Sequence, residues 1–529
     1  TGTVCYADGD RMVIAIPECA EVSRLESTQT AGVMLSFDET SYRTMFESID
    51  RTIKARGRLA ELRDLFYSRR KVSELTFAPI GFPYLNNAQE TAVNKVLCAK
   101  DVAIVHGPPG TGKTTTLVEA IAETLRRESQ VLVCAQSNMA VDWICEKLVD
   151  RGVHVLRLGN PSRVNDKMLS FTYERRFESH PDYPDLWSIR KAIRELRSMR
   201  RKSSDQWHQK MDRLRSRATE LEIRINQDLF NSAHVIASTL VGSSNRLLDG
   251  MKFSTLFIDE AAQALEAACW IPIRRAGRVV LAGDHCQLPP TVKSHEAMKG
   301  GLGKSLMERL VENHPEAVVL LTMQYRMNHE IMRFSNEWFY GGAMVAAPEV
   351  KHRGILDYDT PIDWIDTADA DIAKDADQEK PPFRECIAGE SHGRINRDEA
   401  EFSILTLRKY IEKIGKQRFL DEQIDVGLIS PYRAQVQYLR GLIKRTPFFK
   451  PFRNLISINT VDGFQGQERD VIMISLVRSN EDGNIGFLRD LRRMNVAMTR
   501  ARMKLIIIGD VATLTRHPFY RHLHSSIYK

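Results

Sequence analysis

The stretch that decides the predicted fold is Gly107-Pro108-Pro109-Gly110-Thr111-Gly112-Lys113-Thr114. It fits the phosphate-loop pattern G-x-x-x-x-G-K-[ST] at every fixed position. The glycines let backbone N–H groups turn toward a phosphate without a Cβ in the way, the lysine brings a positive charge to the outer phosphate oxygens, and the last hydroxyl can ligate Mg²⁺. The stretch therefore predicts a nucleotide site. Its candidate binding residues are Gly107, Pro108, Gly110, Thr111, Gly112, Lys113, Thr114 and the adjacent Thr115.

The flanking sequence supplies the context that a phosphate loop needs. Residues 102–105 form a short apolar run typical of a buried parallel strand, and from residue 113 to residue 127 apolar side chains recur at helical spacing. Strand, loop and helix thus follow in the required order, with the phosphate expected at a helix N-terminus. This order predicts an α/β fold.

Length and composition indicate a multidomain globular protein. The chain has 529 residues, 43% of them hydrophobic, with 20 prolines and 30 glycines, which is enough apolar material for two large domains with accessories. No run of 18 or more apolar residues occurs, and the first residues lack the basic-then-apolar order of a signal peptide. We therefore expect an intracellular protein without a membrane segment.

The eight cysteines show no pattern of metal ligands along the sequence. No C-x-x-C pair or Cys/His ligand spacing is present, which predicts reduced thiols and argues against structural zinc or an iron–sulfur cluster. They stand at positions 5, 19, 98, 134, 145, 269, 286 and 386.

Basic residues are concentrated in one segment. The formal net charge is +7, which is compatible with a polyanionic partner, and residues 190–202 carry seven Lys or Arg against the single acid Glu195. Such a run is equally typical of a solvated helix face, so the sequence leaves both interpretations open.

Periodicity divides the chain into segments. Residues 1–40 have short β-like runs, including residues 11–16 and 32–37, and suggest a partial barrel-like element. Residues 41–77 have helical spacing and predict a stalk. We expect two α/β domains over residues 78–321 and 322–529. The first carries a helical-hairpin insertion at about 185–230, and the second an irregular insertion at about 345–395.

Apolar runs alternate with helical segments through both predicted domains. The strand-like runs after the phosphate loop span residues 131–134, 153–158, 235–238, 255–258 and 279–282. A second set begins near residue 317 and spans residues 318–321, 426–429, 456–460, 471–475 and 505–508. This alternation predicts a largely parallel sheet in each domain.

A pair of carboxylates follows one of these strands. Asp259 and Glu260 come directly after an apolar run, which places them at the edge of the sheet where open α/β folds bind ligands. This is a Walker B arrangement, in which the aspartate would hold Mg²⁺ and the glutamate would orient and deprotonate a water for ATP hydrolysis.

Four further strings complete a recognisable series. They are Gly283-Asp284-His285-Cys286-Gln287-Leu288-Pro289-Pro290, Gln324-Tyr325-Arg326-Met327, the run from Thr460 to Glu468, and the run from Asn495 to Arg502. Together with the phosphate loop and the Walker B pair, they resemble superfamily 1 helicases of the Upf-like group over about residues 85–510. That group includes the nonsense-mediated-decay RNA helicase, senataxin and the immunoglobulin-mu-binding-protein helicase. The resemblance implies two tandem RecA-like P-loop NTPase domains around one ATP.

The resemblance also implies roles for single residues around ATP and Mg²⁺. Gln89 is similar to the adenine-reading glutamine, Tyr325 to the aromatic that stacks on the base, and Glu468 to the ribose contact. Arg326 and Arg500 match the two arginines that reach the γ-phosphate, and Gln287 the γ-phosphate sensor. The implied catalytic set is Lys113, Asp259, Glu260, Gln287, Arg326 and Arg500, with Thr114 and Asp259 as the Mg²⁺ ligands.

Single-stranded nucleic acid is the partner that the resemblance implies. Short hydroxyl and amide side chains suit backbone contacts, since they bond phosphate and sugar without distinguishing bases. The implied residues are Ser137, Asn138 and Thr239 on the first domain, and Pro431, Tyr432 and Thr460 on the second. Where the group usually has proline, this chain has Gln136, which leaves the shape of that loop open.

We therefore expect a monomeric ATP-dependent helicase or translocase, with 5′ to 3′ movement implied by the resemblance alone. The alternative is a nucleic-acid-binding clamp or scaffold whose ATP site acts only as a switch. A helicase fused to a nuclease is also conceivable, although no acidic nuclease motif is visible in the sequence. RNA and DNA remain equally possible, because backbone contacts distinguish them mainly at the 2′-OH.

Overall fold

A computed structural model describes residues 3–8, 11–15, 32, 39–198, 205–369, 383–389 and 393–528. The strand expected over residues 32–37 lies outside this range apart from Gly32. Residues 199–204 of the basic run and residues 370–382 of the expected irregular insertion also lie outside it.

The described chain forms two compact units that alternate along the sequence. The first unit comprises residues 1–63, 125–256 and 267–277, and the second comprises residues 64–124, 257–266 and 278–529. The domain boundaries expected from the sequence remain predictions.

The first unit contains a β-hairpin, a parallel sheet and a set of helices. β1 (Thr3–Asp8) and β2 (Arg11–Ala15) pair antiparallel, and the parallel strands run in the order β5-β6-β4-β7. The strands are β4 (Val131–Ala135), β5 (Val155–Arg157), β6 (Val235–Thr239) and the start of β7 (Phe253–Asp259). The helices include α2 (Thr40–Ile53), α3 (Arg58–Phe66, shared with the second unit), α6 (Asn138–Asp150), α7 (Tyr173–Glu178) and α10 (Glu266–Ile273).

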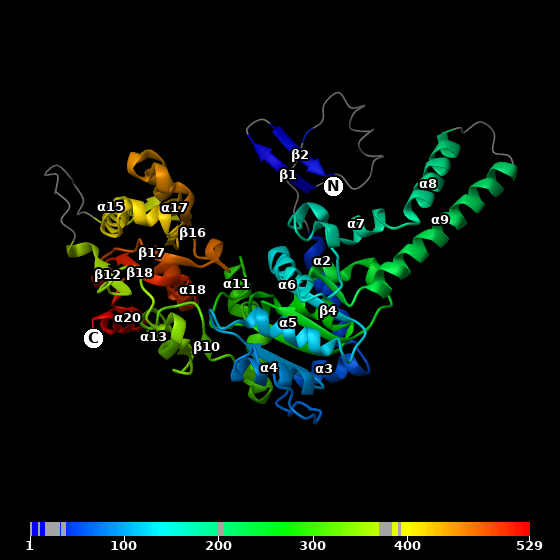
Figure 1. The fold of residues 1–529 in the computed structure, drawn as a ribbon, viewed down its shortest axis with the longest axis horizontal. Helices are drawn as coiled ribbons and strands as arrows, with labels where there is room; N and C mark the ends of the chain where they lie inside the picture. The colour runs from blue at the N-terminus through cyan, green and yellow to red at the C-terminus, as the bar shows by residue number, and fades with distance from the viewer. Residues whose placement is uncertain are drawn as a thin grey trace. The chain divides into compact units, whose positions relative to one another are not determined.

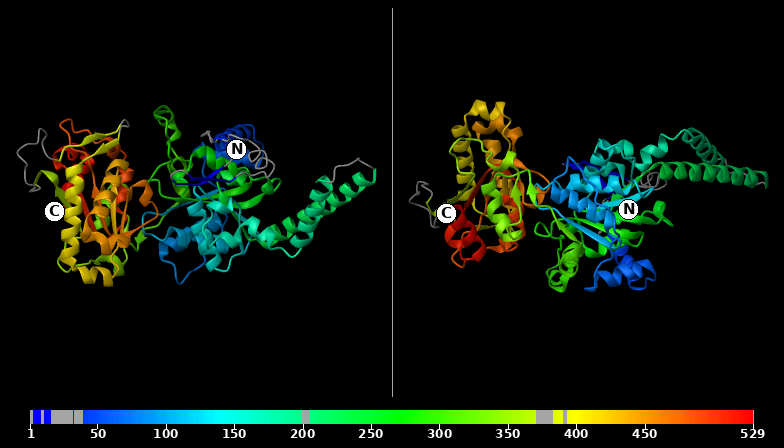
Figure 2. Two further views of the ribbon diagram at one scale, coloured as in Figure 1. Left: turned by 90° about the horizontal axis from the view of Figure 1, so that it is seen from above. Right: turned by 60° about the horizontal axis from the view of Figure 1, so that its bottom comes forward.

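Two long helices stand where the sequence predicts a helical hairpin. α8 (Tyr183–Ser198) and α9 (Asp205–Ser232) run side by side and contact each other (Figures 1 and 2). The buried residues of α9, such as Ala218, Leu221 and Ile225, recur at intervals of three and four. This spacing places them on one face of the helix.

In the second unit, the strand before the phosphate loop lies inside a parallel sheet. The order is β7-β8-β3-β9, with β3 (Val102–His106) between β8 (Ala276–Gly283) and β9 (Val318–Leu320). All five β3 residues are buried, as expected for a strand with neighbours on both sides. β9 therefore belongs to this sheet and not to a second set of strands beginning near residue 317. The helices α4 (Asn87–Cys98) and α5 (Lys113–Thr124) contact each other beside it.

A five-stranded parallel sheet forms the other part of the second unit. Its order is β12-β18-β17-β15-β16. The strands are β12 (Ile362–Asp366), β15 (Val426–Ser430), β16 (Ile456–Thr460), β17 (Arg469–Ser475) and β18 (Ala501–Gly509). β12 lies within residues 345–395, so this segment contributes an edge strand and is not irregular throughout.

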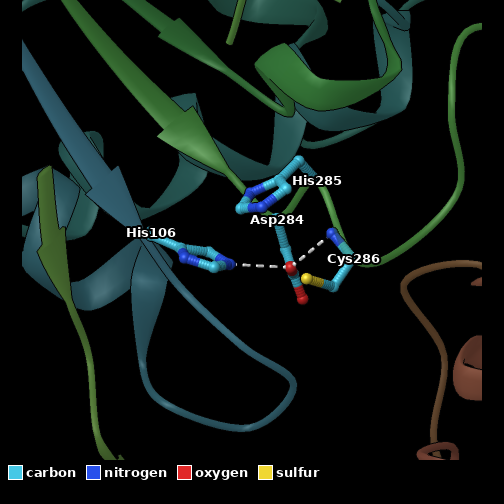
Figure 3. A group of neighbouring side chains, drawn as sticks. All are labelled: His106, Asp284, His285 and Cys286. Atoms are coloured by element: carbon cyan, nitrogen blue, oxygen red, sulfur yellow. Dashed lines mark hydrogen bonds and ion pairs between the residues drawn. The ribbon is translucent and has the colours of Figure 1, made fainter. Parts of the chain in front are cut away.

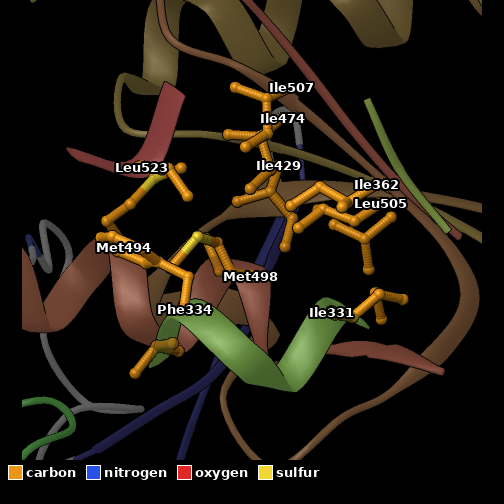
Figure 4. Close-up of a cluster of buried hydrophobic side chains, with 14 of the residues drawn as sticks. Ile331, Phe334, Ile362, Ile429, Ile474, Met494, Met498, Leu505, Ile507 and Leu523 are labelled. Atoms are coloured by element: carbon orange, nitrogen blue, oxygen red, sulfur yellow. The ribbon is translucent and has the colours of Figure 1, made fainter. Parts of the chain in front are cut away.

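Helices cover both faces of this sheet. Alternate residues of β18 point to opposite sides, so Leu505 and Ile507 join one buried cluster while Ile506 and Ile508 join another. The first cluster (Figure 4) also takes residues from α13 (His329–Phe339), α18 (Leu491–Met498) and α20 (Pro518–Ile527). The second takes residues from α15 (Arg397–Ile414) and α17 (Arg433–Arg445).

Shorter elements connect these layers in the second unit. They are α11 (His295–Ala297), α12 (Leu306–Asn313), β10 (Met323–Gln324), β11 (Val345–Ala346), α14 (Pro348–Lys351), β13 (Cys386–Ala388), β14 (Gly393–Ile395), α16 (Lys416–Asp421) and α19 (Val511–Leu514). Among the described residues, no helix has both the length and the apolarity that a membrane span requires.

Candidate nucleotide site and strand-binding residues

The phosphate loop connects the end of β3 to the start of α5. Gly110 and Gly112 have φ of +76° and +74°, which favour glycine over any residue with a side chain. Both glycines also make close approaches: a Cβ on Gly110 would lie 2.6 Å from Cβ of Arg326, and one on Gly112 would lie 2.5 Å from Nε2 of Gln89. The loop therefore lies against two of the residues that the sequence assigned to the nucleotide site.

Lys113 forms ion pairs with the Walker B carboxylates. Its Nζ lies 2.6 Å from Oε1 of Glu260 and 3.1 Å from Oδ1 of Asp259. Burial by itself lowers the pKa of Lys113, but the two carboxylates outweigh burial and raise this pKa above its ordinary value. Lys113 is thus charged, and phosphates that bind in the loop must compete with Asp259 and Glu260 for it.

Glu260 is held in a strained backbone conformation. Its φ of 52° and ψ of 36° place it in the left-handed region, which costs a residue with a side chain about 1 kcal/mol or more. The Glu260 N–H donates to Oδ1 of Asp259 across 2.8 Å, and Gln263 Nε2 donates to Oε2 of Glu260 across 2.8 Å. These contacts fix both the backbone and the carboxylate.

The oxygen atoms beside Lys113 suit a magnesium ion. Asp259 is buried at the end of β7, and Thr114 is half-buried in the first turn of α5. A carboxylate and a hydroxyl are the hard oxygen ligands that Mg²⁺ takes alongside water and phosphate oxygens. The residues present therefore fit the predicted pair of Mg²⁺ ligands.

Arg500 and Gln287 are directly bonded. Arg500 Nη2 donates to Oε1 of Gln287 across 2.7 Å, and its Nε donates to the carbonyl of Val496. Burial, followed by the nearby Arg326, lowers the pKa of Arg500 to about 9. A buried, incompletely neutralised guanidinium of this kind favours an anion beside it.

Arg326 is also held in place by its neighbours. Its Nε lies 2.5 Å from Oε2 of Glu468, and Nη1 donates to the carbonyl of Thr499 across 3.0 Å. Glu468, which the resemblance assigns to the ribose, is therefore paired with this arginine in the structure.

The two residues assigned to adenine share Asn86 as a partner. The Asn86 side chain accepts from the Gln89 backbone N–H, and Nδ2 of Asn86 donates to the hydroxyl of Tyr325 across 2.9 Å. Gln89 Nε2 donates to the carbonyl of Thr111 across 3.2 Å, which ties it to the phosphate loop. The Tyr325 N–H donates to the Gly110 carbonyl across 2.8 Å. Gln89 and Tyr325 therefore both lie at the loop.

A buried polar network next to the loop was not identified from the sequence. His106, the residue before Gly107, lies with Nε2 2.9 Å from Oδ1 of Asp284 (Figure 3), and the Tyr340 hydroxyl donates to Oδ2 of Asp284 across 2.7 Å. Gln287 Nε2 donates to the same Oδ2 across 2.7 Å. Burial opposes ionisation of Asp284, but hydrogen bonds and charge from His106 prevail, so its pKa lies below the ordinary value. In the sequence, Asp284 stands within the motif Gly283–Pro290 without an assigned role, and His106 and Tyr340 lie outside the recognised motifs.

The three strand-binding candidates of the first unit lie at or just after the ends of sheet strands: Ser137 precedes α6, Asn138 is its first residue, and Thr239 is the last residue of β6. Ser137 is exposed and caps α6 by accepting from the Ala140 N–H across 3.1 Å. Oδ1 of Asn138 accepts from Arg157, and the Thr239 hydroxyl accepts from the Gly242 N–H. Ser137 is thus the most accessible of the three.

The three candidates of the second unit differ in exposure. Pro431 and Thr460 are half-buried at the ends of β15 and β16, whereas the Tyr432 side chain is only 4% exposed. The Tyr432 ring packs 5.5 Å from that of Phe487, and its hydroxyl accepts from Arg478. The Tyr432 side chain is therefore used for packing and hydrogen bonding inside the second unit.

Comparison with known proteins identifies the family of this chain. Two family models, each described as an AAA domain, match residues 84–295 and 302–512. The chain is 36% identical over 462 residues to the DNA-binding protein SMUBP-2 of Mesocricetus auratus, covering 83% of this chain and 44% of that protein. It is 33% identical over 482 residues to an uncharacterised ATP-dependent helicase of Methanocaldococcus jannaschii, covering 83% of this chain and 70% of that one.

A third relative is a regulator of nonsense transcripts 1 homolog of Arabidopsis thaliana, 35% identical over 460 residues, which are 84% of this chain and 34% of the relative. The chain thus spans less than half the length of the SMUBP-2 and nonsense-transcript relatives. The ranges that the two family models match contain the phosphate loop, the Walker B pair and both arginines. The chain belongs to the Upf-like group of superfamily 1 helicases.

Proposed function

We propose that this chain is an ATP-dependent helicase or translocase on single-stranded nucleic acid. The observation that carries the proposal is the position of Arg326 against the phosphate loop, where its Cβ limits the space beside Gly110. An arginine more than 200 residues downstream of the loop thereby completes the nucleotide site. Arg500, bonded to Gln287, supplies a second guanidinium. In phosphoryl transfer such cations neutralise charge that develops on the transferred group.

Hydrolysis follows from an exchange of partners at Lys113. When ATP binds, its phosphates take the Lys113 ammonium from Glu260, because a triphosphate carries more charge than one carboxylate. The released Glu260 carboxylate then orients and deprotonates the attacking water, while Gln263 keeps it in place. Mg²⁺, held by Thr114 and Asp259, would neutralise the phosphate oxygens.

Strand contacts come from residues in both units, and all of these residues except Pro431 have short polar side chains. Ser137, Asn138 and Thr239 lie in the first unit, and Pro431 and Thr460 lie in the second. Such groups form hydrogen bonds with phosphate and sugar and do not distinguish the bases. We therefore infer binding without strong sequence preference. Closure around ATP and reopening after hydrolysis would alternately tighten and release these contacts and so move the strand.

The proposed site needs no second copy of the chain. Both arginines, the phosphate loop and the Walker B pair belong to the same compact unit of one chain. We therefore propose that the working form is a monomer. Sedimentation of the ATP-bound protein tests this, and a dimer whose ATPase rises with protein concentration would contradict it.

Unwinding assays test the proposed function and its direction together. Duplexes of RNA and of DNA, each with a 5′ or a 3′ single-stranded tail, are incubated with ATP and Mg²⁺. We expect unwinding of 5′-tailed duplexes, the direction that the group implies, and the more efficient nucleic acid identifies the preferred substrate. ATP-dependent strand binding without unwinding or translocation would favour the clamp or scaffold.

A further inference from the structure

Four side chains with metal-binding atoms meet beside the phosphate loop. They are His106, Asp284, His285 and Cys286, which we call the His106 cluster, and one ligand atom of each lies within 4.8 Å of those of the others (Figure 3). His106 comes from the end of β3, and the other three follow the end of β8.

One pair in the His106 cluster already has the spacing of two ligands on one ion. Nε2 of His106 and Oδ1 of Asp284 are 2.9 Å apart. Two ligands that each bind zinc at about 2.0–2.1 Å stand roughly 3 Å apart, so these atoms need little movement to share an ion.

His285 supplies a second observation that points to a ligand. Its Nδ1 is buried and has no hydrogen-bond partner within the described part of the chain. A buried nitrogen without a partner is costly, and coordination to a cation is one way to satisfy it. The Cys286 thiol is bonded to a single weak partner, because its sulfur donates to the Phe339 carbonyl across 3.4 Å and otherwise packs against the hydrophobic cluster of the five-stranded sheet.

We propose that the His106 cluster is a binding site for a thiophilic divalent cation of the Zn²⁺ type. Two imidazoles, a carboxylate and a thiolate match the borderline and soft preferences of such ions, whereas Mg²⁺ prefers oxygen ligands. Binding requires that Cys286 release its thiol proton and that His106 carry its proton on Nδ1 while Nε2 holds the ion.

The site would regulate the proposed ATPase through Asp284. Oδ2 of Asp284 accepts from Gln287, whose Oε1 accepts from Arg500. A cation on Oδ1 withdraws charge from this carboxylate and weakens its hold on Gln287. Because Gln287 also holds Arg500, a loosened Gln287 leaves this arginine less well positioned for the phosphate. We therefore expect metal binding to inhibit ATP hydrolysis. This step rests on the proposed function, whereas metal binding itself does not.

Titration with Co²⁺ alone tests the site without any assay of activity. Cobalt in a zinc-type site gives visible bands and a near-ultraviolet thiolate charge-transfer band. We expect one equivalent with both signals in the whole chain. In His285→Gln we expect a loss of affinity at least as large as the roughly 10- to 100-fold caused by removing an outer partner of a ligand. Cys286→Ser should lose the charge-transfer band. Cys386→Ser removes an exposed thiol and is the control. It should retain the cobalt affinity, the visible bands and the charge-transfer band.

The outcomes separate the site from adventitious binding. A charge-transfer band that survives in Cys286→Ser, or that disappears in Cys386→Ser, overturns the proposal. So does the absence of saturable binding, provided that circular dichroism shows a folded protein. Zn²⁺ inhibition of ATP turnover that is lost in His285→Gln would establish the regulatory step. Normal Co²⁺ binding with no inhibition would contradict that step alone.

Discussion

Arg500 donates to Oε1 of Gln287 across 2.7 Å, and Nε2 of the same glutamine donates to Asp284. The arginine proposed to meet the γ-phosphate is thus linked through one amide to the strand beside the phosphate loop. The Gln287 side chain alone makes this link between Arg500 and Asp284. A change in charge at the phosphate can therefore alter the position of Arg500.

Replacing Arg500 by lysine tests this link. Lysine keeps the positive charge but cannot bond Gln287 and the Val496 carbonyl from one planar group. We expect kcat for ATP to fall about 10³-fold or more, with a smaller change in KM, because the contact strengthens in the transition state. Arg516→Lys, at an exposed arginine of the same unit, is the matched control. Equal activity in both variants would contradict the role of Arg500.

Gly110→Ala probes the contact between the phosphate loop and Arg326. Alanine at a positive φ costs about 1 kcal/mol, and here its Cβ would also lie 2.6 Å from Cβ of Arg326. Gly152→Ala is the control, because Gly152 has φ +81° with no atom within 4 Å of the added Cβ. Both variants should lower the melting temperature, but only Gly110→Ala should abolish nucleotide binding and ATP turnover. A fully active Gly110→Ala would show that the loop tolerates displacement of Arg326.

Glu399 predicts a pH-dependent stability. Burial raises its pKa to about 7 although Ser475 and the Val477 N–H donate to Oε1, and Oε2 is buried without a partner among the described groups. An unfolded glutamate has a pKa near 4.5, so between pH 4.5 and 7 the unfolded state binds fewer protons and stability falls as pH rises. The loss is on the order of 3 kcal/mol.

Glu399→Gln should remove this slope, because an amide stays neutral across the range. Thermal unfolding of both proteins at pH 5 and pH 7.5 measures it. The melting temperature of the variant should rise relative to that of the parent as pH increases. Parallel pH profiles of the two melting temperatures would show that Glu399 ionises normally.

Charge reversal on α8 tests whether the basic run binds the strand. Lys191, Arg194 and Arg197 are exposed on this helix. If they meet phosphates, changing all three to glutamate should weaken binding and reduce the salt slope by about one for each lost contact. The measurement is strand affinity as a function of salt concentration. An unchanged slope would favour a solvated helix face.

The parts of the site that the sequence predicts are those encoded locally. The phosphate loop and the Asp259–Glu260 pair each occupy one short stretch, so residue type and spacing identify them. The contact between His106 and Asp284 joins residues 178 positions apart, and no local pattern reports it. The same holds for the His106 cluster, which cysteine spacing could not reveal.

The fold shows the same limit. Apolar runs located the sheet strands, but they could not show which strands pair. They could not place β9 beside β3, the strand before the phosphate loop, or β12 at the edge of the five-stranded sheet, because pairing depends on tertiary contacts. The contact between the rings of Tyr432 and Phe487 likewise joins residues that are distant in sequence.

The most direct test of the account is steady-state ATP hydrolysis with and without a homopolymer strand, for the parent protein and Glu260→Gln. The variant keeps the side chain's shape but removes the base, so it should bind ATP and lose turnover by about 10²-fold or more. We predict that the strand stimulates the parent and not the variant. Hydrolysis that ignores the strand, or strand-stimulated hydrolysis that persists in Glu260→Gln, would contradict the claim that this site drives movement on nucleic acid.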